Sequence, residues 1–187
     1  MSDLKSQFYH LHLHTEYSLL DGAIRIDSLF EKCHEYGMDA VSMTDHGTMF
    51  GAAAFYEKAK KESIKPVIGC EVYVAPRSLN DRTQVDRKGL RHLVLLAKDR
   101  EGYTNLCKLV SIAQLKGFYY KPRIDKELLT NYSKGLIGLS ACLKGEISQY
   151  IIHNKIDDAD DAARFYLNTF GENNFFLEVQ ENGIQII

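Results

Sequence analysis

The most constraining feature of this sequence is a run of histidines that alternate with apolar residues near its start. His10, His12 and His14 occupy every second position of residues 8–14. Residues two apart on an extended strand point to the same face, so this spacing predicts three imidazoles on one side of a strand. Burying imidazoles without polar partners is costly, and neutral imidazole is the commonest metal ligand in proteins. The segment therefore indicates a metal site, and the alternative is an edge strand with solvated histidines.

Other residues with metal-binding side chains stand at or near the ends of later predicted strands. Asp21 lies in an Asp-Gly turn soon after the histidines and can supply an oxygen ligand. The complete set of candidate ligands is His12, His14, Asp21, His46, Glu71, His92 and Cys142. Nitrogen, oxygen and thiolate ligands together suit zinc, manganese or iron better than magnesium or calcium. The set exceeds what one ion needs, so it predicts a cluster of two or three divalent ions.

Three of these residues also have ordinary structural explanations. His46 could be a hydrogen-bonded core histidine, Glu71 an ion-paired residue at a strand end, and Cys142 a small buried hydrophobe. Their occurrence near successive strand ends favours a shared site, because such ends gather at one rim of a barrel.

Hydrophobic periodicity predicts an alternation of strands and helices along the chain. After the histidine strand, the predicted strands cover residues 40–44, 66–75, 93–97, 136–139 and 175–179, and the predicted helices cover 27–36, 50–64, 102–116, 145–153 and 159–170. Residues 76–89 are polar and are expected to form a loop. This order is typical of parallel α/β architecture, either an open sheet or part of a barrel. The first strand is not followed by G-x-G-x-x-G, which argues against dinucleotide binding.

Composition limits the classes of protein to consider. A chain of 187 residues with a net charge of −2 fits one soluble domain without a broad basic surface for nucleic acid. We expect no membrane span, because the apolar runs are short, and no signal peptide, because the N-terminus is polar. The four cysteines are dispersed and form no C-x-x-C motif, which favours the reducing cytoplasm.

The motifs that contain the candidate ligands resemble those of the polymerase and histidinol phosphatase (PHP) superfamily. They are His12-Leu-His14, Leu20-Asp-Gly22, Thr44-Asp-His-Gly47 and Gly69-Cys-Glu71, followed by the separate His92 and Cys142. Four longer segments resemble the PHP domain that begins the alpha subunits of bacterial DNA polymerase III. These are residues 17–22, 101–106, 117–125 and 138–147. The resemblance covers the chain, and we expect residues 1–187 to form one PHP domain.

The resemblance implies a distorted seven-stranded, TIM-like β/α barrel with up to three metals at one rim. Such sites use about nine ligands, and the two still to be found, an Asp and a His on the last strand, are expected beyond Ile187. The chain is therefore expected to be an N-terminal fragment that stops before the barrel closes. His92 fits poorly, because it precedes the apolar run 93–97 whereas a barrel ligand follows its strand. Either that strand runs in an irregular direction, or His92 enters from the loop.

The implied function is that of a domain of a replicative DNA polymerase with a phosphoesterase site of the 3′–5′ exonuclease type. The nucleophile is then a water activated by the metals. The implied partners are primer–template DNA, deoxynucleotides bound by polymerase domains outside this sequence, and other subunits of the polymerase III holoenzyme, including its exonuclease subunit. The alternatives are a free-standing phosphatase for a small phosphomonoester and a structural, metal-stabilised module that docks other replisome subunits.

One further segment, residues 118–123, mixes aromatic and basic residues in a way that can stack bases and pair phosphates. It ends with Lys121 and Arg123, which we expect to contact nucleic acid. The alternative is that its aromatic residues are core and its charges are solvated.

Overall fold

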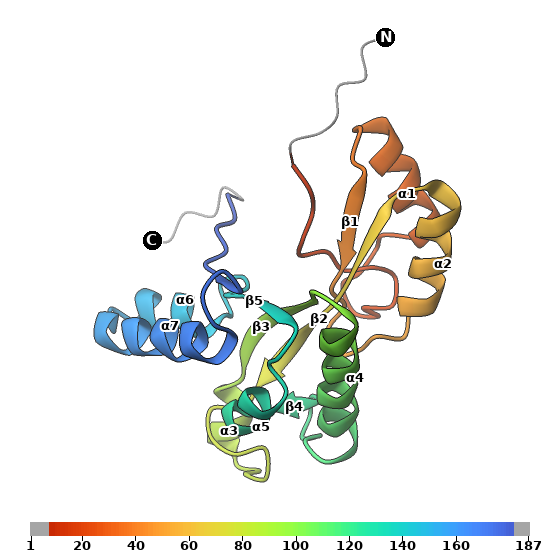
Figure 1. The fold of residues 1–187 in the computed structure, drawn as a ribbon. Coiled ribbons are helices and arrows are strands. Elements are labelled where there is room, and N and C mark those ends of the chain that lie inside the picture. Colours follow the sequence, from red (N-terminus) through yellow and green to blue (C-terminus); the bar gives the residue numbers. More distant parts are fainter. Residues whose placement is uncertain (1–7, 182–187) are drawn as a thin grey trace.

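The computed structural model describes residues 8–181, in which seven helices surround one mixed sheet (Figure 1). The strands are β1 Ala40–Met43, β2 Lys65–Val74, β3 Arg91–Ala97, β4 Arg123–Ile124, β5 Leu136–Leu139 and β6 Phe175–Phe176. The helices are α1 Ile26–Glu35, α2 Ala52–Glu62, α3 Gln84–Lys88, α4 Arg100–Leu115, α5 Lys126–Asn131, α6 Glu146–Ile152 and α7 Ile156–Phe170. The α/β fold class is confirmed, whereas closure of a seven-stranded barrel stays a prediction.

The strands follow the order β1-β2-β3-β5-β6, with β4 beside β2. β1 and β4 are parallel to β2, and β6 is parallel to β5, but β3 is antiparallel to both β2 and β5. The expectation of a wholly parallel sheet is therefore wrong at β3. The connection from β2 to β3 contains only the short helix α3 and turns back at the same end of the sheet, whereas a parallel connection must return to the other end.

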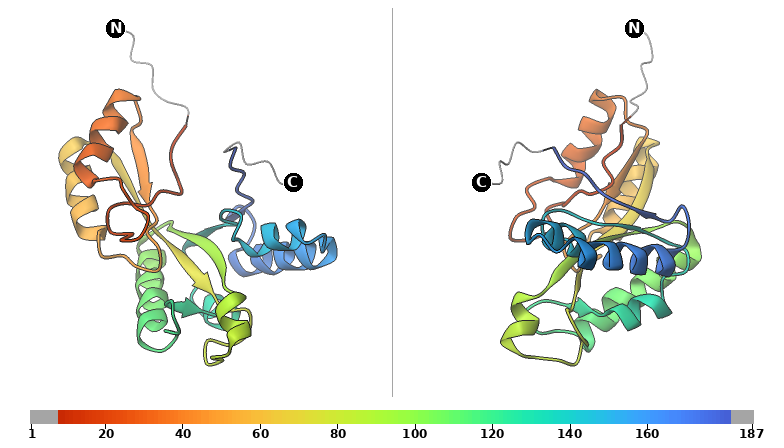
Figure 2. Two further views of the ribbon diagram at one scale, coloured as in Figure 1. Left: turned by 180° about the vertical axis from the view of Figure 1, so that it is seen from behind. Right: turned by 90° about the vertical axis from the view of Figure 1, so that its left-hand side faces the viewer.

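Two helical groups cover different parts of the sheet (Figures 1 and 2). α1 and α2 pack around β1 and bury a core that includes Phe30, Met43 and Phe55. α4, α5, α6 and α7 pack around β2, β3 and β5, where Leu95 and Leu109 are fully buried. None of the helices within residues 8–181 is long and apolar enough to span a bilayer.

Strand alternation separates a core face of the sheet from a polar face. Cys70, Val72 and Val74 of β2 join the larger core, so the intervening Glu71 and Tyr73 point to the opposite face. In the β2–β3 register, Tyr73 lies opposite His92 and Glu71 lies opposite Val94. A small apolar cluster also lies on this polar face, and its members are Val94, Leu96, Leu139 and Ala141.

The opening histidine segment differs from its prediction, because it lies along β1 without forming a regular strand. The backbone N–H of Thr44 donates to the Leu13 carbonyl at 2.8 Å, but the Leu13 N–H donates to the Thr44 hydroxyl at 2.8 Å. A side chain therefore replaces one rung of the ladder. His12 and His14 turn inward, whereas His10 is exposed and its ring contacts Phe8.

The polar connection between β2 and β3 is more ordered than a solvated loop. Thr83 and Asp86 form a reciprocal capping box around α3, and the buried Asp86 also accepts two hydrogen bonds from Arg77. Arg123 ties this connection to the segment before β4. Its Nη1 and Nη2 donate to the carbonyls of Asp81 and Leu79, at 2.8 and 2.7 Å. A third hydrogen bond runs from Arg123 Nε to the Gly117 carbonyl at 2.9 Å. We call these three contacts the Arg123 anchor.

Candidate metal centre

The centre of the candidate site is the Glu71 carboxylate, which is 1% exposed and surrounded by histidines. Its Oε1 contacts His92 Nδ1 at 2.8 Å and His12 Nε2 at 3.4 Å. Its Oε2 lies 3.6 Å from His14 Nε2 and also contacts His46 Nδ1. The ligand atoms of His12, His14 and Glu71 lie within 4.8 Å of one another, and so do those of His46, His92 and Glu71. Glu71 therefore belongs to two groups of converging ligand atoms.

The first histidine pair is oriented by groups outside the cluster. His14 Nδ1 lies 2.9 Å from the Thr44 carbonyl, an acceptor, so this nitrogen carries the proton and Nε2 is left as a lone pair facing Glu71. His12 Nδ1 lies 2.7 Å from Glu178 Oε1, and its Nε2 also faces Glu71. The two rings meet edge to face, with centroids 5.0 Å apart.

His46 follows β1 and extends its pairing with β2, because it forms a bridge with Glu71. The preceding residue, Asp45, is fully buried and accepts hydrogen bonds from the Thr15 N–H at 2.6 Å and the Ser18 hydroxyl at 2.7 Å. Asp45 therefore holds the turn that carries Asp21 against the sheet. The exposed Asp21 carboxylate reaches His46 Nε2 at 3.1 Å, at the margin of the cluster.

His92 reaches the centre because β3 is antiparallel to β2. The start of β3 lies beside the end of β2, so a residue at the beginning of this strand arrives at the same rim as residues near the ends of the parallel strands. The irregular strand direction is thus the correct explanation of its place in the sequence. Cys142 is half-buried and lies close enough to His92 for each residue to shift the pKa of the other, but it lies outside the two groups of converging ligand atoms.

Sequence reasoning did not identify Glu178, which lies in the extended segment after β6. Its backbone N–H donates to the Ser140 hydroxyl at 2.8 Å, and its carboxylate binds His12. The available signal was a lone acidic residue in the otherwise apolar run 175–179, the same signal that identified Glu71.

Charges within the cluster are strongly coupled. Burial by itself favours neutral side chains, but contacts with Glu178 and Glu71 outweigh it and raise the pKa of His12 to about 10. In the same way, Cys142 and Glu71 raise the pKa of His92 against the effect of burial to about 9. Burial and the neighbouring His46 lower the pKa of His14, and the histidines hold the pKa of Glu71 well below its usual value despite burial.

The cluster fits a metal by an independent test, the pairing of its buried polar atoms. His12 Nε2, His46 Nδ1 and Glu71 Oε2 are buried but lack a hydrogen bond of acceptable geometry. Buried polar atoms in native proteins are nearly always paired, so three such atoms facing one another indicate a missing partner. Imidazole and carboxylate donors suit zinc, manganese or iron. The ligand assignments of Asp21 and Cys142 rest on their single contacts with His46 and His92.

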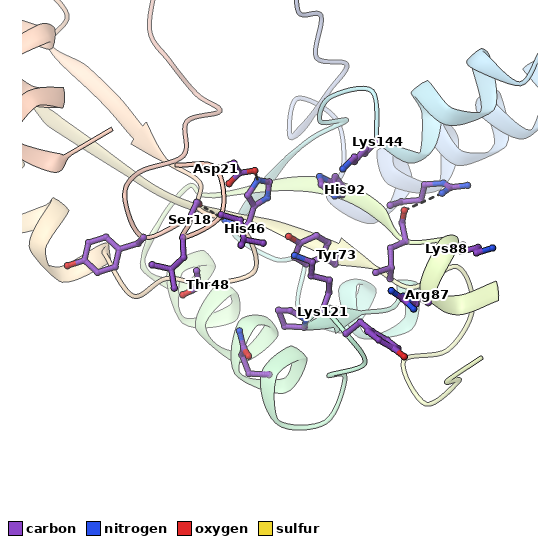
Figure 3. Close-up of a pocket in the computed structure, with 18 of the residues that line it drawn as sticks. Ser18, Asp21, His46, Thr48, Tyr73, Arg87, Lys88, His92, Lys121 and Lys144 are labelled. Atoms are coloured by element: carbon purple, nitrogen blue, oxygen red, sulfur yellow. Dashed lines mark hydrogen bonds and ion pairs between the residues drawn. The ribbon is translucent and has the colours of Figure 1, made fainter. Parts of the chain in front are cut away.

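The two proposed nucleic-acid contacts have different environments. Lys121 lines a cavity beside the cluster, with its Nζ 5.3 Å from the centre of the Tyr73 ring (Figure 3). Arg123 is fully buried, and the Arg123 anchor occupies its guanidinium with backbone carbonyls. We therefore replace the expected contact of Arg123 with a structural role.

Comparison with family models gives a match to the PHP domain over residues 10–182. The chain belongs to the PHP family. Over 182 residues it is 48% identical to "DNA polymerase III subunit alpha" of Borreliella burgdorferi, covering 97% of this chain and 16% of that relative. The protein of the same name from Aquifex aeolicus is 47% identical over 187 residues, with the same two coverages. This PHP chain thus spans about one sixth of the length of these relatives.

Among solved structures, the chain is similar to a candidate metal-dependent phosphoesterase from Bifidobacterium adolescentis. That similarity has 18% sequence identity and a TM-score of 0.41, and it covers 59% of this chain and 34% of the other.

Proposed function

We propose that this chain carries a metal-dependent phosphoesterase site of the 3′–5′ exonuclease type within the alpha subunit of a replicative DNA polymerase. The observation that carries the proposal is the convergence of four histidines on the buried Glu71, where three of the ligand atoms lack a hydrogen bond of acceptable geometry. The relatives that share nearly half of their aligned residues with this chain are named as alpha subunits, which supports the polymerase context.

The residues of the cluster divide between holding metal and orienting the ligands. Glu71 belongs to both groups and would help to hold metal, together with His12 and His14 in one group and with His46 and His92 in the other. When bound, such ions supply a more acidic water and positive charge against the charge that develops on a phosphate during hydrolysis. The Thr44 carbonyl and Glu178 fix the rings of His14 and His12, a role that outer partners have in many metal sites.

Tyr73 is placed to orient a substrate rather than a metal. Its ring stacks beside His46 and meets His92 edge to face, and it lines the adjacent cavity. Burial and the nearby Glu71 raise the pKa of Tyr73 to about 12, so its hydroxyl keeps its proton at neutral pH. The hydroxyl would donate a hydrogen bond to a phosphate oxygen.

In the longer protein, we propose primer–template DNA and deoxynucleotides as substrates and the other polymerase III holoenzyme subunits, including its exonuclease subunit, as partners. Nucleotide transfer would belong to segments outside this chain, because the relatives are about six times longer.

The proposal is tested by stripping the chain with chelator, restoring manganese or zinc, and measuring metal content and hydrolysis. A primer with a 3′ mismatch is compared with a small phosphomonoester. His46→Ala should reduce primer degradation by more than about 100-fold, because losing a ligand exceeds the effect of losing an outer partner. His34→Ala is the matched control, since His34 is an exposed histidine that also pairs with a carboxylate, Glu62 at 3.1 Å.

Three outcomes would replace the proposal. Undiminished primer degradation by His46→Ala would remove the cluster from the reaction. Preference for the phosphomonoester would favour a small-molecule phosphatase. Stoichiometric metal without hydrolysis of either compound would indicate a structural module.

A further inference from the structure

A cavity of about 990 Å³ opens beside the metal centre, and its charge differs from that of the chain. Asp21, His46 and His92 line one part of it. The basic residues that line it are Arg87, Lys88, Arg91, Lys121 and Lys144. Asp21 is the one acidic residue in the described lining, whereas the chain as a whole has a net charge of −2. The cavity is therefore a local cationic region, which suits a ligand with more than one phosphate.

The side chains that line this cavity include two pairs of an aromatic and a basic group. The Tyr73 ring lies beside His46, with centroids 6.1 Å apart, and Lys121 lies over Tyr73. Arg87 lies over the Tyr120 ring, with its guanidinium carbon 4.0 Å from the ring centre. In Figure 3, Lys121 lies beside Tyr73, and Arg87 lies farther from His46 than either.

The Arg87–Tyr120 pair is held in place by the surrounding backbone. Tyr120 has φ of 60°, an unusual conformation for an aromatic residue, yet 56% of the residue is exposed. The buried Asp86 fixes the helix that carries Arg87, and the Arg123 anchor joins that helix's loop to the segment that carries Tyr120. Strain at an exposed aromatic residue on a fixed loop indicates selection for the position of the ring.

We propose that Arg87 and Tyr120 form a binding platform for one nucleotide of a single-stranded polynucleotide whose terminal phosphodiester lies at the metal centre. Each nucleotide offers one phosphate to a cation and one base to an aromatic ring, which matches the aromatic–basic pairs of the cavity. A small phosphomonoester at the cluster would contact His46 and Tyr73 without reaching this pair. The inference rests on the proposed phosphoesterase function and adds the part of the site that selects a polymer.

Binding is measured by the fluorescence anisotropy of a labelled oligothymidylate with chelator-treated protein, so the result does not depend on bound metal. Arg87→Gln should reduce the slope of log affinity against log salt by about 0.7, the contribution of one phosphate contact on a single strand. Tyr120→Gly should weaken binding on the order of tenfold with little change in slope, because it removes stacking rather than charge. Glycine suits the positive φ at this position, so the variant should still fold.

Tyr120→Phe should restore wild-type affinity, because it retains the stacking ring. The controls are Lys32→Ala and Tyr36→Ala. Each removes one partner of a lysine–tyrosine contact of 5.7 Å between α1 and the residue that follows it, outside the cavity lining. Unchanged affinity and slope in both Arg87→Gln and Tyr120→Gly would overturn the platform.

Hydrolysis of bis(p-nitrophenyl) phosphate by the manganese-loaded protein separates this inference from the proposed function. Both variants should retain it, because this small phosphodiester does not extend to the platform. If both variants hydrolyse this phosphodiester but bind the oligonucleotide as the wild type does, the platform is refuted and the phosphoesterase function stands. Platform-dependent binding without hydrolysis of either substrate would refute the phosphoesterase function and leave the platform standing.

Discussion

Two polar clusters around buried charged side chains in this PHP chain differ in how completely they are paired. In the Arg123 anchor, all three guanidinium nitrogens donate to carbonyls at 2.7–2.9 Å. In the candidate metal centre, His12 Nε2, His46 Nδ1 and Glu71 Oε2 remain without an acceptable hydrogen bond. Because unpaired buried groups are destabilising, the first cluster is complete within the protein and the second is suited to a ligand. Pairing, rather than charge, therefore separates structural from functional sites here.

The largest effect is expected when the anchor is broken. Arg123→Ala leaves three carbonyls, one on a buried residue and two on half-buried residues, without their charged donor and should destabilise the chain by about 3–5 kcal/mol. Arg123→Lys should recover little, because an ammonium cannot reproduce the planar fork. Urea denaturation measures both. Arg82→Ala is the control, since Arg82 donates to a single carbonyl at the surface. If Arg123→Ala lost no more stability than Arg82→Ala, the structural role of Arg123 would be refuted.

A smaller effect, which depends on metal, is expected at the other cluster. If metal completes the centre, a concentration 100-fold above Kd should stabilise the native chain by about 2.7 kcal/mol. Glu71→Gln should abolish this gain, because Glu71 belongs to both groups of ligand atoms. Thermal unfolding with and without manganese measures the difference, and Glu62→Gln is the control, because Glu62 is a half-buried carboxylate outside the cluster that also pairs with a histidine. Equal metal stabilisation of wild type and Glu71→Gln would break the contrast between the two clusters.

The smallest effect concerns Asp86, which is fully paired beside the anchor. Hydrogen bonds from Arg77 and then Thr83 hold the pKa of Asp86 below its ordinary value. Its carboxylate therefore stabilises the fold above the unfolded pKa of about 3.9, and this contribution is lost as pH falls toward the lower folded value. Asp86→Asn should have a lower melting temperature than wild type at neutral pH, and the gap should narrow in acid. A gap that is constant with pH would mean that its charge is not responsible.

The sequence predicted regular elements better than the connections between them. The bounds of β5 coincide with the prediction, and α1, α2, α4 and α6 lie within two residues of theirs, because their apolar periodicity reflects burial against the sheet. The connections hold what was missed, namely α3, α5 and β4. Short elements bury too few side chains to leave a periodic pattern.

The candidate site shows the same division. Histidines and Glu71 stand out in apolar surroundings, so their side-chain types alone indicated a cluster. The burial of Arg123 left no comparable signal, because arginine is usually exposed and its partners here are backbone carbonyls some forty residues earlier. Composition does not encode strand direction either, so only the β2–β3 register could decide whether His92 arrives by a reversed strand or from the loop.

That reversal also bears on the order in which the site assembles during folding. Glu71 and His92 are 21 residues apart on adjacent strands, whereas His12 and Glu178 are separated by 166 residues. Contacts of short sequence separation incur less loop-closure entropy and form faster. We therefore expect Glu71 and His92 to meet early, within one hairpin, and His12 to join only when distant parts of the chain dock. A nascent chain would thus bring Glu71 and His92 together before it could complete the site.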